Sequence, residues 1–255
     1  QQLTLNKMEQ DVKTICAPQK KYFRQRAHSN PLADHSFLYP VCPAAMNWHP
    51  FYPNYFTPDG NSCNNLEKVE IVDIGCGYGG MLITLSPLFT KSLILGMEIR
   101  VKVSAFVHQR ILALRNQGNK NDFQNIAVIR TNAMKYMTNF FNKGQLKCLF
   151  FLFPDPHFKK KKNKWRIISS TLLSEYAYVM AEGGIVYTMT DVLELHEWMK
   201  THFVEHPLFE QLTPEQYSCD PVVEKLYEST EEGKKVTRNN GNKYLAIFRR
   251  LPNPI

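Results

Sequence analysis

The sequence lacks long hydrophobic runs, paired cysteines and an excess of acidic residues. No apolar stretch approaches the roughly 20 residues of a transmembrane helix, and the first residues do not form the hydrophobic core of a signal peptide. The six cysteines include no C-x-x-C pair, which favours free thiols over disulfides or a zinc site. We therefore expect a protein that neither spans a membrane nor is secreted, and that holds no metal.

Composition indicates an ordinary folded protein with an acidic partner. The 255 residues are 44% hydrophobic and 21% charged, which suits one large α/β domain or two small ones. Lysine and arginine number 31 against 23 acidic residues, giving a net charge of +8. This charge balance favours nucleic acid or an anionic membrane surface as a partner.

The first 68 residues show no regular periodicity. We predict that residues 1–30 form a flexible basic arm, and that residues 31–68, rich in proline and aromatics, form an irregular segment packed on the core. In the arm, basic residues alternate with two aromatics, a pattern suited to phosphate pairing and base stacking or, alternatively, to a solvated tail. These residues are Lys20, Lys21, Tyr22, Phe23, Arg24, Arg26 and His28.

The spacing Arg24-x-Arg26-x-x-Ser29 within this arm resembles a site for a basophilic kinase. Phosphorylation of Ser29 would add up to about two negative charges to a basic patch. We expect that modification to weaken the binding of a polyanion.

Apolar runs and helical patterns alternate through residues 69–251. Strands are predicted at 69–75, 92–99, 125–131, 148–153, 185–190 and 244–250, and helices at 79–88, 100–116, 167–180 and 192–203. This alternation predicts βαβ units, and therefore an α/β domain with a largely parallel sheet covered by helices on both faces.

Glycines and acids at the ends of the first two strands predict a nucleotide-like ligand. The first strand ends in D-x-G-x-G, with Asp73, Gly75 and Gly77, and Glu98 ends the second, where an acid can bind both ribose hydroxyls. A dinucleotide and S-adenosylmethionine are the candidates. The position of Asp73 favours S-adenosylmethionine, because a pyrophosphate prefers bare N–H groups at a helix start whereas a methionyl ammonium prefers an acid.

The third predicted strand is followed by Asn132 and Ala133. The amide of Asn132 suits the edge of an adenine ring, and Ala133 leaves room for the ring. The alternative for Asn132 is a helix N-cap, and one side chain can serve both purposes.

Residues 147–166 join an apolar strand to a block of lysines through a turn that holds Asp155 between two prolines. The lysines are Lys159, Lys160, Lys161, Lys162 and Lys164; they suit RNA phosphates, a solvated loop or a nuclear localisation signal. We expect Arg100 and Arg166 to reach phosphates from helix starts, and His157 to contact the substrate. For Asp155 the alternative to a role in chemistry is a turn residue.

Several segments together resemble the catalytic subunit of eukaryotic tRNA (guanine-N7)-methyltransferases. They are RQRAHSNPLADH, DIGCGYGG, LGMEIRVKV, FQNI, R-x-NAM, FFLFPDPHFKKKKNKWR, VYTMTDVLELHEWM, STEEGKK and FRR, and they extend from about Lys20 to Arg250. The resemblance implies a single Rossmann-like class I methyltransferase domain with a mostly parallel seven-stranded sheet. It also implies S-adenosylmethionine as donor, with S-adenosylhomocysteine as product, and a guanosine in the tRNA variable loop as target. A WD-repeat β-propeller partner and a location in the nucleus, without excluding the cytoplasm, are further implications.

Residue by residue, the resemblance assigns cofactor contacts and a catalytic acid. The cofactor contacts are Gly75, Gly77, Glu98, Ile99, Arg100, Asn132, Ala133 and Leu152, and the catalytic acid is Asp155. Thr230 and Glu232 match positions beside the family's active site, and we include them in the cofactor-binding set.

Guanine chemistry predicts the role of Asp155. The N7 atom carries an in-plane lone pair and no proton, so the reaction needs alignment more than a base. The N1–H and N2 groups of guanine are donors that suit a carboxylate, so we expect Asp155 to orient a flipped base. Two alternatives stay open: amino-group methylation of nucleic acid or protein, since PDPHF loosely resembles a D-P-P-Y loop, and a non-catalytic RNA-binding subunit.

Overall fold

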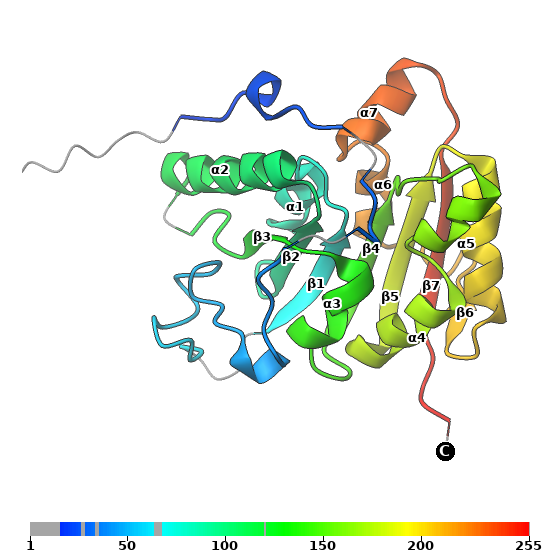
Figure 1. The fold of residues 1–255 in the computed structure, drawn as a ribbon, viewed down its shortest axis with the longest axis horizontal. Helices are drawn as coiled ribbons and strands as arrows, with labels where there is room; N and C mark the ends of the chain where they lie inside the picture. The colour runs from blue at the N-terminus through cyan, green and yellow to red at the C-terminus, as the bar shows by residue number, and fades with distance from the viewer. Residues whose placement is uncertain (1–15, 27–28, 34–35, 64–67, 120, 255) are drawn as a thin grey trace, which may run out of the picture.

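The computed structural model describes residues 16–26, 29–33, 36–63, 68–119 and 121–254. These residues form one seven-stranded sheet with the strand order β3-β2-β1-β4-β5-β7-β6 (Figure 1). The strands are β1 (Val69–Ile74), β2 (Leu93–Glu98), β3 (Ile126–Arg130), β4 (Leu146–Leu152), β5 (Met180–Thr190), β6 (Phe209–Gln211) and β7 (Tyr244–Arg250). The pairs from β3 to β5 are parallel, and β7 is antiparallel to both of its neighbours. The predicted Rossmann-like, mostly parallel sheet is confirmed.

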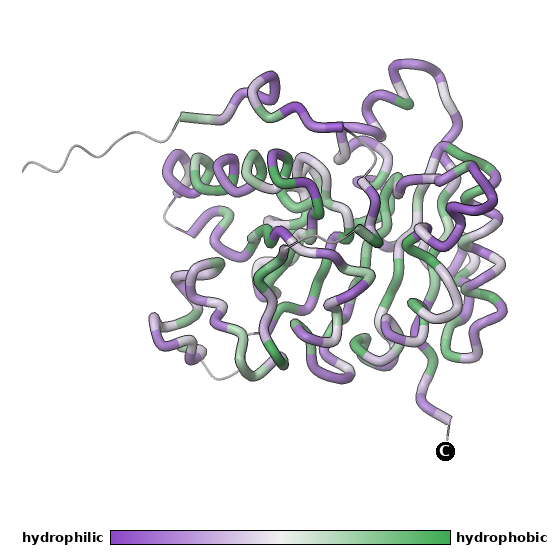
Figure 2. The backbone as a smooth tube through the Cα atoms, viewed as in Figure 1, coloured by the Kyte–Doolittle hydropathy of each residue, from purple (hydrophilic) through white to green (hydrophobic). Residues whose placement is uncertain are grey.

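Helices cover both faces of the sheet. They are α1 (Gly80–Leu85), α2 (Val101–Gln117), α3 (Ala133–Phe140), α4 (Ser170–Val179), α5 (Leu193–Glu205), α6 (Pro221–Leu226) and α7 (Glu231–Arg238). Helices α1, α2 and α6 pack into one apolar cluster, and α3, α4 and α5 pack into another on the opposite face. The central strands are hydrophobic along their length because they are buried on both sides (Figure 2).

Two element boundaries differ from the sequence prediction. Helix α4 begins three residues after the predicted start, because the Ser169 hydroxyl accepts a hydrogen bond from the Leu172 N–H and caps the helix there. Strand β5 begins at Met180 rather than at 185, since its first part bulges around Gly183, which has a φ of 78°. The glycine pair therefore lies inside the strand and does not precede it.

Three α-helices and one strand have no counterpart in the periodicity prediction: α3, β6, α6 and α7. Helix α7 shows the reason. Its sequence EEGKKVTR is almost wholly polar, and it buries only Gly233 and Val236. The helix is stabilised by the packing of these two residues and by the N-cap of Thr230. It has no apolar stripe.

The segment before the sheet lies against the domain. It contains the short 3-10 helices η1 (Lys20–Phe23) and η2 (Pro43–Ala45), and η1 lies along α2 (Figure 1). Phe23 packs edge-on against Phe106 with 5.6 Å between ring centroids. Farther along, the Tyr52 hydroxyl donates to the Ile94 carbonyl at 2.9 Å and is fully buried. No described helix is long and apolar enough to cross a bilayer.

The strand order reverses direction between β1 and β4. In open α/β sheets a ligand crevice forms at this point, outside the carboxyl ends of the strands. The glycine loop that follows β1 and the Pro-Asp-Pro turn that follows β4 therefore face each other across one crevice.

Candidate active site

A cavity of about 560 Å³ lies at the carboxyl ends of β1, β2, β3 and β4. Its volume is in the range of small-molecule sites. The structure brings together there every predicted cofactor residue: Asp73, Gly75, Gly77, Glu98, Ile99, Arg100, Asn132, Ala133, Leu152, Thr230 and Glu232. Asp155, His157 and Ser29 line the same cavity, so the predicted cofactor and substrate residues share one space.

Two glycines shape the wall of the cavity. Gly75 has a φ of 73°, and a Cβ added there would meet no atom within 4 Å, so its backbone faces open space. Gly80, at the start of α1, is instead tightly packed. A Cβ on Gly80 would lie 2.0 Å from the carbonyl oxygen of Ser229, so the absence of a side chain lets the segment before α7 close against α1.

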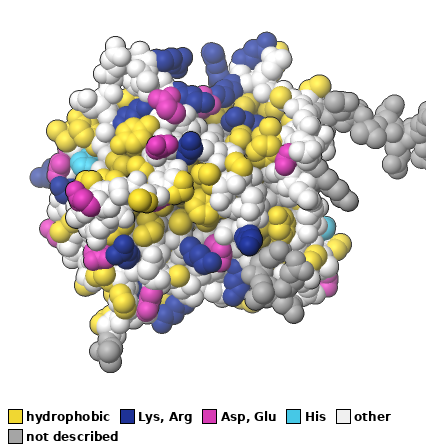
Figure 3. Space-filling view, turned by 180° about the vertical axis from the view of Figure 1, so that it is seen from behind, with side chains coloured by type: hydrophobic (Ala, Val, Ile, Leu, Met, Phe, Trp, Pro, Cys, Tyr) yellow, Lys and Arg dark blue, Asp and Glu magenta, His cyan; other side chains and the backbone are white. Residues whose placement is uncertain are grey.

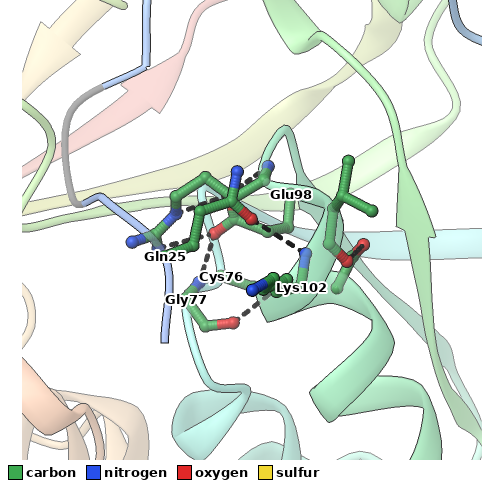
Figure 4. A network of polar contacts seen from close by, with 8 residues as sticks. Gln25, Cys76, Gly77, Glu98 and Lys102 are labelled. Carbon is green, nitrogen blue, oxygen red and sulfur yellow. Dashed lines mark hydrogen bonds and ion pairs between the residues drawn. The ribbon is translucent and has the colours of Figure 1, made fainter. Parts of the chain in front are cut away.

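Glu98 is the most heavily hydrogen-bonded acid of the site (Figure 4). It is 3% exposed. Its Oε1 accepts from the Arg100 backbone N at 2.9 Å and from Arg100 Nε at 3.0 Å, and its Oε2 accepts from Gly77 N at 3.1 Å and from Arg100 Nη2 at 3.0 Å. A carboxylate offers about four acceptor positions. All four positions of Glu98 are therefore occupied, and a ribose diol can hydrogen-bond Glu98 only if the Arg100 side chain moves away from it.

Asp73 lies beside Glu98 at the end of β1 and is 2% exposed. Burial, with a smaller contribution from the charge of Glu98, raises the pKa of Asp73 from 3.8 to about 7. The negative charge of a buried acid next to another acid is poorly stabilised, so such an acid favours a cationic partner. The methionine end of a bound S-adenosylmethionine carries such a cation.

Both polar atoms of the Asn132 side chain form hydrogen bonds within the protein. Its Oδ1 accepts from Met134 N at 3.0 Å and caps α3, as the N-cap prediction states. Its Nδ2 donates to the carbonyl of Pro31 at 2.6 Å and holds the start of the 31–68 segment at the cavity, where Pro31 and Ser29 of the arm both form part of the wall. Gln25 also fixes the arm, since its Oε1 accepts from Lys102 N at 2.8 Å (Figure 4).

The turn after β4 carries Asp155 to the other side of the cavity. Phe153 and His157 have φ values of 53° and 45°, which bend the chain sharply on both sides of Asp155. Burial acts to lower the pKa of Arg100, but the hydrogen bonds and charge of Glu98, together with the charge of Asp155, raise it above its ordinary value. The Arg100 guanidinium is thus attracted by the carboxylates of both Glu98 and Asp155.

The lysine run flanks the cavity without lining it. It continues into the 3-10 helix η3 (Lys160–Trp165), where Lys162 lies 4.6 Å from the Trp165 ring centroid. Trp165 lines the cavity and packs edge-on against His157 at 5.5 Å. Arg24 and Arg26 are exposed, and His28 lies outside the described residues. Seen from behind, lysine and arginine side chains gather along the upper edge, the edge of η1 and α7 in Figure 1 (Figure 3).

The prediction that Arg166 contacts phosphates is wrong. The residue is 2% exposed and lies in the extended segment before α4, not at a helix start. Its Nη2 pairs with Glu194 Oε1 at 2.7 Å, its Nε donates to the Pro156 carbonyl at 2.9 Å, and its guanidinium stacks on Trp198. Arg166 therefore supports the Asp155 turn from inside the fold.

Sequence reasoning missed several residues of the cavity. Asp191 follows β5 directly and lines the cavity, and a strand-end acid at this sheet edge was the signal that could have identified it. Thr131, Phe158 and Trp165 also line it. No pattern distinguishes such threonines and aromatics from core residues. In the described part of the chain, no group of three or more histidines, cysteines or acids is arranged to hold a metal ion.

The sequence is similar to a protein family, to named relatives and to solved structures. Residues 67–246 match a family model described as a putative methyltransferase. A Bombyx mori protein named tRNA (guanine-N(7)-)-methyltransferase is 62% identical over 237 residues, covering 93% of this chain and 97% of that protein. A Caenorhabditis elegans protein of the same name is 58% identical over 256 residues, covering 98% and 97%. The solved 16S rRNA methyltransferase KamB has a TM-score of 0.49 at 16% identity, covering 73% of this chain and 89% of that chain.

Proposed function

The chain belongs to the tRNA (guanine-N7)-methyltransferase family, and from this premise we propose how its cavity performs the family's reaction. The protein is an S-adenosylmethionine-dependent enzyme that methylates N7 of a guanosine in tRNA. We propose that this guanosine lies in the variable loop, and that cofactor and flipped base occupy the single cavity side by side. The observation that carries the proposal is that Asp155 shares this cavity with the glycine loop and Glu98.

Three features support the fit of S-adenosylmethionine. The cavity has the volume of a small-molecule site, the backbone at Gly75 faces open space, and Asp73 is a buried acid without adequate compensation. When bound, S-adenosylmethionine supplies a methyl group on a sulfonium, which a neutral nucleophile can attack directly. Asp73 would meet the ammonium, Glu98 the ribose, and the walls formed by Asn132 and Ala133 the adenine.

The other residues assigned to the cofactor form the rest of its binding site in this proposal. Gly77 and Ile99 contribute backbone on either side of Glu98, and Leu152 separates the cofactor from the guanine. Thr230 caps α7 by accepting from Gly233 N at 2.9 Å, and this holds Glu232 at the cavity.

Arg100 links the two halves of the cavity. Its side chain uses two acceptor positions of Glu98 that the ribose hydroxyls need, at distances of 3.0 Å each. We infer that Arg100 turns away from Glu98 when the ribose binds. Asp155 is the second acid that raises the pKa of Arg100, so the released guanidinium moves toward the substrate half.

Asp155 orients the base instead of removing a proton. N7 of guanine carries no proton, whereas N1–H and the N2 amino group are donors that fit a carboxylate. Holding that edge aligns N7 with the methyl group, which is catalysis by positioning. The Asp155 carboxylate also lies where positive charge develops on the purine during transfer.

Basic residues of the arm and of the lysine run bind the RNA in this proposal. We propose that Arg24, Arg26 and His28 of the arm and the lysines between Lys159 and Lys164 pair with tRNA phosphates, while His157 stays beside the base. Ser29 lines the cavity, so a phosphate there would bring about two negative charges to the RNA side and weaken binding.

The family resemblance also leads us to propose a WD-repeat β-propeller partner and a nuclear location. Co-purification of the two chains after joint expression tests the partner. A fluorescent fusion in which the lysines of residues 159–164 are replaced by glutamine tests whether this exposed run also directs the protein to the nucleus.

Replacing Asp155 by alanine separates orientation from tRNA binding. We expect turnover to fall by at least about 100-fold, the loss typical of a group that acts in the transition state, with the Kd for tRNA changed less than about threefold. Asp59, an exposed acid in a turn outside the cavity, provides the control, and Asp59→Ala should keep full turnover. A large loss of tRNA affinity in Asp155→Ala, or turnover close to that of the wild type, would refute the orienting role.

A further inference from the structure

Thr131 holds a buried hydroxyl that the fold does not use. The residue directly follows β3 and is 1% exposed. Its backbone N–H donates to the Glu98 carbonyl at 3.1 Å, but its Oγ1 has no hydrogen-bond partner among the described residues. The described chain has four such buried atoms, on Arg130, Thr131, Asn163 and His196, and of these residues Thr131 lines the cavity.

The other two buried threonines of the described chain, both in β5, are paired. Thr188 in β5 is 0% exposed, and its hydroxyl donates to the Ala246 carbonyl at 2.9 Å. Thr190 at the end of β5 accepts from Val192 N at 3.2 Å. A buried hydroxyl without a partner destabilises a fold, and valine has nearly the same shape without that cost. Thr131 therefore differs from its counterparts in a way that packing does not explain.

We propose that the Thr131 hydroxyl is a cofactor contact that hydrogen-bonds the adenosine half of S-adenosylmethionine. This inference rests on the proposed function and adds a residue to it. Thr131 is hydrogen-bonded through its backbone to Glu98, which we assign to the ribose, and directly precedes the Asn132–Ala133 wall, which we assign to the adenine. Asp73 and Leu152, at the methionine end, belong to other strands.

The chemistry of the two groups matches. Adenine presents ring nitrogens that accept hydrogen bonds and an amino group that donates them, and a threonine hydroxyl can do either. A protein group that stays unpaired until its ligand arrives also discriminates strongly, because an analogue without the matching atom leaves it unpaired. Thr131 thus favours the purine over rings of similar size.

The test compares Thr131→Val with Thr131→Ser and with Thr188→Val as the matched control. Thermal unfolding of each protein without ligand gives Tm, and calorimetry gives the Kd for S-adenosylhomocysteine and for 5′-methylthioadenosine, which lacks the amino-acid end. We expect Thr131→Val to unfold no earlier than the wild type yet to bind both ligands about 10-fold more weakly. Thr131→Ser should bind within about threefold of the wild type, because it keeps the hydroxyl. Thr188→Val should lower Tm and leave both affinities unchanged.

Several results would overturn the inference. Equal binding by Thr131→Val and the wild type would exclude the contact. A loss for S-adenosylhomocysteine without a loss for 5′-methylthioadenosine would move the contact to the methionine end. A Tm several degrees below that of the wild type would show a structural partner for the hydroxyl. Failure of the wild type itself to bind S-adenosylhomocysteine would instead refute the proposed function.

Discussion

Replacing Asp73 by asparagine should strengthen the fold and weaken cofactor binding. Burial and the nearby charge of Glu98 raise the pKa of Asp73 from 3.8 to about 7. A difference of this size corresponds to on the order of 4 kcal/mol between the charged and neutral forms. Because the folded pKa is raised, the neutral form stabilises the fold; that contribution is fully present below the pKa of the unfolded chain and is lost as the pH rises through about 7.

The wild type therefore carries the full electrostatic penalty at about pH 8, and asparagine carries none. We expect Asp73→Asn to raise Tm by several degrees at that pH and to match the wild type near pH 4. The Kd of the wild type for S-adenosylmethionine should tighten as the pH rises toward 7 and then level off, because the ammonium pairs with the ionised acid. The variant should bind more weakly, without this pH dependence.

Thermal unfolding at the two pH values and calorimetric titration of S-adenosylmethionine measure both effects on the same preparations. Asp59→Asn is the control, because hydrogen bonds from Thr57 and Asn61 lower the pKa of this exposed carboxyl, so removing its charge should not raise Tm at about pH 8. A lower Tm for Asp73→Asn at about pH 8 would contradict the account of Asp73 as a destabilising charge. A wild-type Kd that does not change between about pH 6 and 8 would contradict its pairing with the ammonium.

Three further predictions concern the surroundings of the cavity. Arg166→Met should destabilise the fold by about 2 kcal/mol in denaturant unfolding, through loss of its bonds to Glu194 and the turn, and should leave the salt dependence of tRNA binding unchanged. A flatter salt dependence would mean that Arg166 reaches RNA after all. Alanine at the three lysines of 160–162 should weaken tRNA binding and reduce the slope of log Kd against log salt by roughly one per lost contact, and an unchanged slope would leave these lysines outside the interface. Gly80→Ala should destabilise by about 1–3 kcal/mol and weaken S-adenosylhomocysteine binding, because its Cβ meets the Ser229 carbonyl at 2.0 Å; wild-type melting and binding would refute that contact.

The parallel strands were predictable because burial on both faces requires uninterrupted apolar runs. The runs that became β1, β2, β3 and β4 show this directly. Glycines obscured the start of β5, since Gly183 forms a bulge inside the strand where the sequence indicates a break. Helix α7 was missed because its sequence is almost wholly polar and it buries only Gly233 and Val236, too few residues to form an apolar stripe.

The position of the candidate site was predictable, because the sequence reveals where strands end. The hydrogen-bond partners of the site residues were not predictable, because the sequence does not reveal them. Acids at the ends of predicted strands identified Asp73 and Glu98 before any contact was known. The same reasoning failed for Arg166, which follows a run of mostly exposed lysines in the sequence yet is itself 2% exposed. Thr131 carries no sequence signal at all, because an unpaired hydroxyl becomes visible only when the surrounding atoms are placed.

The position of the transferred methyl group tests the central claim most directly. The chain, alone and together with its proposed WD-repeat partner, is incubated with S-adenosylmethionine and tRNA, and the RNA is treated with borohydride and aniline, which cleave at 7-methylguanosine. We predict cleavage at one guanosine of the variable loop, and none with Asp155→Ala. Methyl incorporation without cleavage would instead indicate transfer to an amino group. Cofactor binding without methyl incorporation, even with the partner present, would indicate a non-catalytic RNA-binding subunit.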